Sequence, residues 1–572
     1  MDNYQAAQVT GQGKREVSRR DFLKLSGAGF AGAALLGVAG CGGGGTIGGG
    51  QGGAGNTFVY GRGADSVTLD PIHSTDSESS KVCLQIFDTL ITFKPGSVDL
   101  IPALATNVPQ PEQNGLVYTF ELREGVTFHD GAPFNAEAVV FNFDRWKDTK
   151  SPYHKGGGAQ GADFSRYGVE FGGFDDDSNI ESVEATDEYT VRLTLKQPQG
   201  AFLNDIAIYT FGMASPKAIK EDVEGFWQKP VGTGPFKFVS WSRGSEIRLE
   251  KYGNWWGKDL PEDQGGRGPF VDAMVFKSIP DNTSRVAALS GGELSGADGL
   301  TPDDVPTVKQ GQGLGVEYQP PLNIGYMAMN LRKKPFDDVR VRRAVALAIN
   351  MPAIVESFFG ETGELASNPM PPLVPYFNKN VEPYPHDPDE AGRLLEEAGL
   401  GDGFDTTLWY MPIPRPYMPD AKGVAQAMQQ DLEEVGIKAK LVTREWGAYI
   451  EETGSGAHDM CILGWSGANA DPDTFLNILL SSDYATDQNA LNVSYYENSR
   501  LDDLMNTALR SADDAERRGL YMEAQEIIHQ DVPMVSIAYA KPPVGLQNSV
   551  EGFVPTVGGE RFNTIELAGG GV

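Results

Sequence analysis

The chain has 572 residues, and its 47 lysines and arginines are outnumbered by 78 aspartates and glutamates, which gives a formal net charge of −31 at pH 7. A body this acidic repels nucleic acid and anionic lipid, so we exclude both as binding partners. With 40% hydrophobic residues, the composition is that of a globular protein and excludes a disordered one. The length suffices for two or three domains with hydrophobic cores of their own.

Residues 1–40 have the features of an export signal that ends at a cysteine. Arg19 and Arg20 shortly precede a Phe-Leu-Lys run, and the apolar stretch 25–38 has 14 positions, too few to span a bilayer as a helix, which takes about 20. The paired arginines resemble the twin-arginine export signal, and the small residues before Cys41 resemble the lipobox of bacterial lipoproteins. We expect lipidation of Cys41; the alternative is an uncleaved helical anchor with an incidental cysteine.

Residues 41–56 are rich in glycine and cannot build a core, so they predict a flexible tether. A chain of this length reaches on the order of 20 Å. The expected location is therefore extracytoplasmic, with the folded body held near the cell membrane by the lipid on Cys41.

From residue 57 onward the pattern is that of a mixed α/β protein. Apolar and polar residues alternate with a period of two, typical of half-buried strands, at 118–122, 189–195 and 246–249. Residues 338–358 have a helical period, and Pro352 is expected to end or kink the helix. Asp387 and Pro388 predict the start of another helix, which Gly399 closes. Later elements are expected at 421–435 (helix), 438–443 (strand), 513–529 (helix) and 535–539 (strand).

Two cysteines besides Cys41 occur in the chain, Cys83 and Cys461. Their surroundings predict a buried helix and a buried strand, where cysteine packs as a small hydrophobic side chain. We favour two free thiols; a disulfide between them is the alternative.

Several segments, in order along nearly the whole body, resemble the family 5 extracellular solute-binding proteins. Those proteins are the peptide-, nickel- and oligosaccharide-binding subunits of ABC importers. The matching segments are Leu69-Asp70-Pro71, the runs Leu122 to Gly131, Pro230 to Phe236 and Val341 to Asn350, and Gly464-Trp465-Ser466. The resemblance implies an α/β, two-lobed periplasmic binding protein-like fold with a two-strand hinge.

The same resemblance implies the division of the body and its function. Lobe I would comprise 57–325 with 540–572, and lobe II 326–539. A solute is enclosed between such lobes as they close. The implied function is capture of a peptide-like solute and its delivery to the permease subunits of an ABC transporter, by a monomer that is not an enzyme and needs no cofactor.

Three further segments, 411–417, 445–449 and 464–473, are similar to dipeptide-binding members of that family. Arg415 has the implied role of binding the solute's carboxylate, because a guanidinium offers two parallel donors and stays charged when enclosed. The alternative for Arg415 is a surface arginine in an ordinary ion pair, and Trp446 is left open between pocket and core. The ligand site implied by the resemblance consists of Ser74, Arg415, Pro416, Tyr417, Trp465, Ser466, Gly467 and Ala468.

The implied partner of the solute's ammonium is missing. The dipeptide-binding pattern has an aspartate where this chain has Ala468, and alanine cannot balance a buried charge. Either Asp471 or Asp473 reaches the amine, or the solute carries no free amine, as in a modified or N-blocked peptide. We favour a different role for Asp471, as a turn residue before Pro472 that caps a helix starting near Asp473.

Other chemistry has less support in the sequence. The six histidines show no metal-ligand spacing, so no metal site is expected, and the chain contains no dinucleotide fingerprint, P-loop or nucleophile elbow. Two alternatives stay open. One is a lipid-anchored extracytoplasmic hydrolase; the other, within the family, is a receptor for nickel or another metal chelate held through the chelator's carboxylates.

Overall fold

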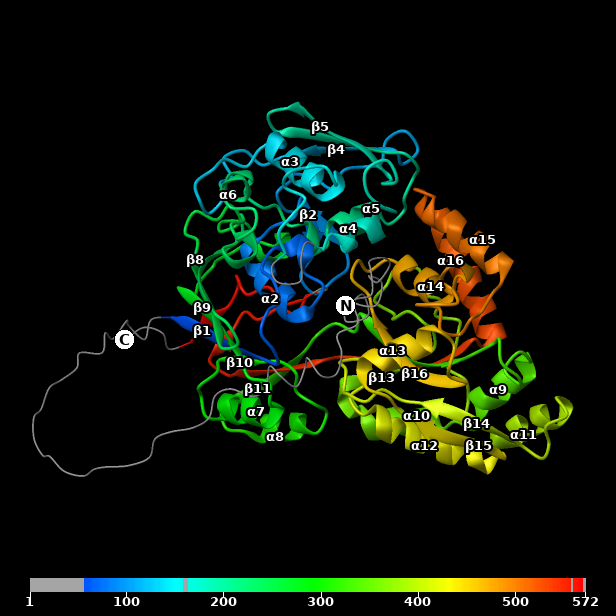
Figure 1. The fold of residues 1–572 in the computed structure, drawn as a ribbon. Coiled ribbons are helices and arrows are strands. Elements are labelled where there is room, and N and C mark those ends of the chain that lie inside the picture. The colour runs from blue at the N-terminus through cyan, green and yellow to red at the C-terminus, as the bar shows by residue number, and fades with distance from the viewer. Residues whose placement is uncertain (1–55, 158–162, 557–558, 569–572) are drawn as a thin grey trace, which may run out of the picture.

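The computed structural model describes residues 56–157, 163–556 and 559–568. They form two lobes, each built on its own β-sheet with helices packed around it (Figure 1). The expected export signal and the tether up to residue 55, with Cys41, lie outside the described residues. Among the helices that are described, none has the length and apolar character that crossing a membrane requires.

The first lobe is organised around β1 (Thr57–Arg62), which runs parallel to both of its neighbours, β9 (Ala273–Ser278) and β10 (Gly296–Ala297). Four more strands complete this seven-stranded sheet: β7 (Phe236–Ser242), β8 (Glu246–Lys251), β11 (Leu314–Tyr318) and β18 (Pro543–Gln547). A smaller antiparallel sheet contains β4 (Val117–Glu121), β5 (Ile180–Asp187) and β6 (Thr190–Leu195). The other elements of this lobe are α2 (Ser77–Ile86), β2 (Ile91–Phe93), β3 (Leu100–Pro102), α3 (Ala136–Lys147), α4 (Ser165–Glu170), α5 (Phe202–Ile206), α6 (Pro216–Glu221), α7 (Asn282–Ser290), α8 (Asp304–Gln310), β19 (Val550–Glu551) and β20 (Glu566–Leu567).

The second lobe is organised around β12 (Asn323–Met329), whose seven residues are all buried. β12 runs antiparallel to β16 (Met460–Ser466) on one side and β17 (Met534–Ala540) on the other. The sheet also contains β13 (Gly363–Leu365), β14 (Phe404–Trp409) and β15 (Ile437–Val442). The helices of this lobe are α9 (Val339–Ala348), α10 (Met351–Phe358), α11 (Pro388–Glu397), α12 (Ala421–Glu434), α13 (Trp446–Gly454), α14 (Asp473–Leu480), α15 (Ser499–Leu509) and α16 (Asp514–Asp531).

The helices and strands expected from periodicity are confirmed, with one refinement. Residues 338–358 form two helices, α9 and α10, because the chain turns at Asn350. The Asn350 side chain accepts a hydrogen bond from the backbone N–H of Ala353. Pro352 lies in the first turn of α10, where a proline interrupts no helical hydrogen bond. The proline thus marks the start of the second helix as well as the break.

The cysteines are part of the two cores. Cys83 lies in α2 and Cys461 in β16, and both are free and fully buried. Burial raises the pKa of each thiol, which keeps it protonated and unreactive. The preference for two small buried side chains over a disulfide is confirmed.

Two short stretches of chain connect the lobes. Residues 319–322 lead from β11 in the first sheet to β12 in the second, and residues 541–542 lead back from β17 to β18. Within residues 56–157, 163–556 and 559–568 the chain crosses only at these two places, so one lobe can rotate against the other about them. The lobe limits inferred from the sequence, 325/326 and 539/540, fall inside β12 and β17, a few residues from these crossings, and stay a prediction.

Hydrogen bonds hold the two crossings together. The backbone N–H of Gln319 donates to the carbonyl of Pro542 at 3.0 Å. The side-chain amide of Asn323 donates to the carbonyl of Ala540 at 2.8 Å and accepts from its N–H at 3.0 Å. Asn323 and Ala540 are both buried, so water does not compete for these bonds. At the hinge the two strands are therefore joined by the backbone bond from Gln319 to Pro542 and by the side chain of Asn323.

Away from the hinge, the lobes meet at α5. Asn469, which follows β16, donates from its side chain to the carboxylate of Asp205 at 2.6 Å. The side chain of Asn204 donates to the backbone carbonyl of Asn469 at 2.7 Å. Asp205 and Asn469 are buried, and burial raises the pKa of Asp205 well above its usual range. In this structure the lobes are closed on one another, and the side chains of Asn469, Asn204 and Arg517 join them here; Arg517 donates to the backbone carbonyl of Gly200 at 3.1 Å.

We predict that Asn469→Ala opens the lobes. The change leaves Asp205 buried without one of its donors, which costs about 1–3 kcal/mol in the closed state and nothing once water reaches the carboxylate. Small-angle X-ray scattering should show a larger radius of gyration than for the wild type. The exposed Asn254 provides the control, Asn254→Ala. An unchanged radius for Asn469→Ala would show that the contact does not hold the lobes together.

Candidate ligand-binding site

A cavity of about 190 Å³ lies at the hinge, and both lobes line it. The first lobe contributes Ser77, Ser80 and Lys81 from the start of α2 and Glu560 from the C-terminal segment. The first crossing contributes Gln319, and the start of β12 contributes Asn323. From the second lobe come Pro416, Tyr417, Trp465, Ser466 and Gly467. The structure thus brings together, in one cavity, these five of the residues that the sequence proposes for the site.

Two glycines let Tyr417 lie flat on the second sheet. Gly325 of β12 and Gly464 of β16 are paired in the register of the sheet. A Cβ atom on Gly464 would overlap the Tyr417 ring, and one on Gly325 would overlap the Tyr417 backbone. Only glycine permits so close an approach. The Gly-Trp-Ser run therefore combines a seat for Tyr417 with the next part of the cavity wall, Trp465.

Arg415 lies next to the hinge cavity. Its guanidinium carbon is 4.2 Å from the centre of the Trp446 ring, a cation–π contact at the start of α13. Its backbone exchanges two hydrogen bonds with Met418, at 3.0 and 2.9 Å, which tighten the loop. The neighbouring Pro416 and Tyr417 line the cavity, whereas the Arg415 side chain is half-buried on Trp446. Trp446 is not among the residues that line the hinge cavity; it is partly buried, packs against the core and contacts Arg415.

The segment after β16 passes through three cavities in turn. Trp465, Ser466 and Gly467 line the hinge cavity. Ala468 lines a second cavity of about 30 Å³. Asn469 lines a third, of about 340 Å³, which also lies between the lobes. One short run of residues therefore follows the interface between the lobes from the hinge outward.

Ser74 lies in the first lobe, deeper than the cavity walls. Its hydroxyl is hydrogen-bonded to the hydroxyl of Tyr209 at 3.2 Å, and both residues are buried. Tyr209 lines the same small cavity as Ala468. Ser74 is thus separated from that cavity by Tyr209.

The two aspartates near Ala468 are engaged within the second lobe. Asp471 accepts from the Arg517 guanidinium at 2.9 and 2.7 Å, and both side chains are buried. Asp471 also accepts from the backbone N–H of Asp473, with which α14 begins. Asp471 is therefore a turn residue before a helix, which agrees with the role that the sequence favours. Burial, followed by the negative charge of Asp471, raises the pKa of Asp473 to about 7.

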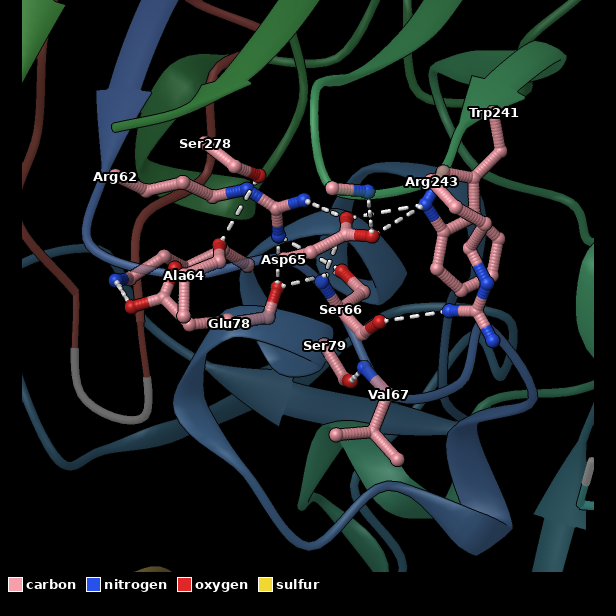
Figure 2. Close-up of polar contacts among 12 residues, drawn as sticks. Arg62, Ala64, Asp65, Ser66, Val67, Glu78, Ser79, Trp241, Arg243 and Ser278 are labelled. Atoms are coloured by element: carbon pink, nitrogen blue, oxygen red, sulfur yellow. Dashed lines mark hydrogen bonds and ion pairs between the residues drawn. The ribbon is translucent and has the colours of Figure 1, made fainter. Parts of the chain in front are cut away.

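Sequence reasoning missed Lys81, and a polar network explains how the fold places it (Figure 2). At the end of β1, Arg62 donates to Asp65 at 3.2 Å and to the backbone carbonyl of Glu78 at 2.5 Å. Asp65 also accepts from the Trp241 indole N–H at 3.0 Å. Strands β1 and β7 thereby fix the first turn of α2, from which Lys81 reaches the cavity. None of these contacts has a local sequence signal.

Beside the cavity, several carboxylates surround the ammonium group of Lys81. Its ammonium forms ion pairs with Glu78 at 2.9 Å and with Asp298. Burial alone would lower the pKa of Lys81, but the negative charges of Asp298 and Glu78 outweigh it and raise that pKa. Glu560 is missed by sequence reasoning as well, since its neighbours lie hundreds of residues away. Burial raises the pKa of Glu560, and the charge of Lys81 opposes this rise.

The part of the chain that the structure describes contains no candidate metal site. In residues 56–157, 163–556 and 559–568, no three histidine, cysteine, aspartate or glutamate side chains are grouped so that they could hold a metal ion. The site is therefore described through its own side chains, which combine flat aromatic walls with a few buried charges.

Comparison with known proteins identifies the family that shares this architecture. The family model of the bacterial extracellular solute-binding proteins, family 5 Middle, matches residues 99–487. The dipeptide-binding protein of Escherichia coli strain K12 is 34% identical, over 84% of this chain and 89% of that protein. Heme-binding protein A of Haemophilus influenzae is also 34% identical, over 90% of this chain and 93% of its own.

A solved structure with the same fold contains a peptide. It is a periplasmic binding protein associated with an ABC transporter from Helicobacter pylori, in complex with the peptide STSA. It is 34% identical to this chain, covers 90% of this chain and 98% of its own, and superimposes with a TM-score of 0.72. The two-lobed fold expected from the sequence is thereby confirmed.

The raised pKa of Asp473 predicts how stability changes with pH. The folded protein keeps this proton up to about pH 7, whereas an unfolded chain loses it near 3.8. Between these values the folded state binds more protons, so this group's contribution to the free energy of unfolding falls as the pH rises. Asp473→Asn removes that loss. We expect its melting temperature to exceed that of the wild type at pH 8 by about 2–4 °C and to match it at pH 4.

Calorimetry or circular dichroism at the two pH values measures this difference. The exposed Asp405 gives the control, Asp405→Asn, which should melt like the wild type at both. Equal destabilisation by Asp473→Asn at pH 4 and pH 8 would contradict the assignment, because it would show a structural role that does not depend on ionisation.

Proposed function

The chain belongs to the bacterial extracellular solute-binding proteins of family 5, and we propose that it captures a small peptide between its lobes and delivers it to an ABC permease. The observation that carries the proposal is the hinge cavity, which both lobes line and which their closure encloses. Its volume of about 190 Å³ is small beside the roughly 300–1,000 Å³ of many ligand pockets, which favours a small solute over one of the size of a porphyrin.

The chemistry of a peptide suits the residues around this cavity. A free peptide is a zwitterion, so its site has to meet a carboxylate and an ammonium with apolar surface between them. We assign the carboxylate to Arg415, because a guanidinium offers a carboxylate two parallel donors and the contact with Trp446 fixes its orientation. Tyr417 and Trp465 are nearly fully buried and supply flat walls for side chains.

The remaining predicted residues have supporting roles in this proposal. Pro416 stiffens the loop that carries Arg415. Ser466 presents a hydroxyl and Gly467 presents backbone groups to the hinge cavity. Ala468 limits the size of the neighbouring second cavity. Ser74 orients Tyr209. Together they account for all of the site residues inferred from the sequence.

The location and the anchor follow from the sequence motifs. We propose export through the twin-arginine signal, cleavage before Cys41, and lipidation of that cysteine. The glycine-rich tether then holds a monomeric receptor beside its permease, outside the cytoplasm and free to turn. A receptor of this kind binds and releases, and we propose that it performs no catalysis.

A titration with a peptide and its amide tests the proposal. We expect Ala-Ala to bind with one site and to be recovered intact, and its C-terminal amide to bind more weakly. Arg415→Ala should weaken binding of Ala-Ala by about 10- to 100-fold, the value of one or two charge-assisted hydrogen bonds, and leave binding of the amide unchanged. Isothermal titration calorimetry gives both affinities.

Arg444 offers a matched control, because it also stacks on a tryptophan, with its guanidinium carbon 4.8 Å from the Trp409 ring centre. Arg444→Ala should bind Ala-Ala like the wild type. Equal losses for Ala-Ala and its amide in Arg415→Ala would contradict a carboxylate contact. Cleaved Ala-Ala would contradict a receptor and favour the hydrolase.

A further inference from the structure

The hinge cavity adjoins a buried cluster of charged side chains in which the acidic groups outnumber the cations. Glu78, Asp298 and Glu560 interact electrostatically with Lys81, and at most 9% of Lys81, Asp298 or Glu560 is exposed. Lys81 forms ion pairs with Glu78 and Asp298. Arg62, the other nearby cation, forms an ion pair with Asp65. Arg62 is buried too and also interacts electrostatically with Glu78 and Asp298. Two cations, Lys81 and Arg62, thus face four acids, Asp65, Glu78, Asp298 and Glu560, so the acids outnumber the cations beside the cavity.

Glu560 is the member of this cluster that lines the cavity. One of its carboxylate oxygens, Oε1, accepts from the side chain of Gln319 and from the hydroxyl of Tyr60. The other, Oε2, is buried and has no hydrogen-bond partner among the described residues. A buried carboxylate oxygen without a partner destabilises the folded protein unless a cation or a donor meets it. The position of Glu560 therefore indicates that the partner comes with the ligand.

The second lobe does not provide the carboxylate that a peptide's amino end requires. Ala468 stands where the dipeptide-binding pattern has an aspartate. Asp471 is bound to Arg517, and Asp473 lines the third cavity rather than the hinge cavity. The negative charge available to a solute in the hinge cavity is thus on the opposite wall, in the first lobe.

We propose that Glu560 binds the cationic group of the captured solute, the α-ammonium of a peptide, in place of the carboxylate missing at Ala468. This inference rests on the proposed function and deepens it. With Arg415 on the second lobe and Glu560 on the first, the two ends of one peptide contact both lobes. A solute held in this way stabilises the closed arrangement, because opening would break one of its two charged contacts.

The test compares Ala-Ala with N-acetyl-Ala-Ala, which has the same carboxylate and no ammonium. We expect the wild type to bind the acetylated peptide at least about 10-fold more weakly, as the loss of a charge-assisted contact implies. Glu560→Gln keeps the size of the side chain and an acceptor for Gln319. It should weaken binding of Ala-Ala to the level of the acetylated peptide and leave the latter unchanged.

Control variants separate this effect from damage to the fold. Glu551→Gln removes an exposed carboxylate from the same C-terminal segment and should bind both peptides like the wild type. Glu560→Asp keeps the charge on a shorter side chain and should retain part of the preference for Ala-Ala. If Glu560→Gln does not fold, as judged by thermal melting, the wild type and Glu560→Asp decide the question.

The outcomes also distinguish the two proposals. A wild type that binds both peptides equally, or a Glu560→Gln variant that keeps the preference for Ala-Ala, overturns the role of Glu560 and leaves peptide capture intact. A wild type that binds neither peptide overturns peptide capture, and the role of Glu560 with it.

Discussion

The structure depends on a buried asparagine, Asn323, that joins the ends of β12 and β17. Next to these two strand ends the chain crosses between the lobes. At the hinge, the ladder between β12 and β17 ends near Gly325, and the chain must cross to the other lobe. The side chain of Asn323 pairs with both backbone groups of Ala540 at this point, so that neither is buried without a partner. Asn323 also lines the cavity. Asn323 therefore joins the ends of β12 and β17 where one wall of the site begins.

Around the hinge, the charges divide into those that serve the fold and those that face the solute. Asp471 and Arg517 satisfy one another inside the second lobe and hold the turn before α14. The cluster at Lys81 differs, because its acids outnumber its cations where the cavity opens. Burying surplus charge is costly, and proteins keep it mainly where a ligand offsets it. The hinge thus has an excess of acidic over basic side chains, as the whole chain does.

The sequence predicts the local elements well because their signals are local. The alternation of apolar and polar residues predicted β4, β6 and β8. The helix cap Asp387, followed by Pro388, predicted α11. The cavity wall from Trp465 to Gly467 could also be proposed, because its sequence resembles a segment of the dipeptide-binding members of the family. The positions of Lys81 and Glu560 could not, since their contacts with Asp298 and Gln319 join residues more than 200 positions apart. The stacking of Arg415 on Trp446 likewise needs the tertiary fold.

The central claim is that this receptor encloses a small peptide at its hinge. The most direct measurement is mass spectrometry of the solute released by denaturing protein that was purified from its own cells without refolding. The account predicts a short peptide with a free amino end and a free carboxylate. An oligosaccharide, a metal chelate or a porphyrin released in stoichiometric amount would contradict it.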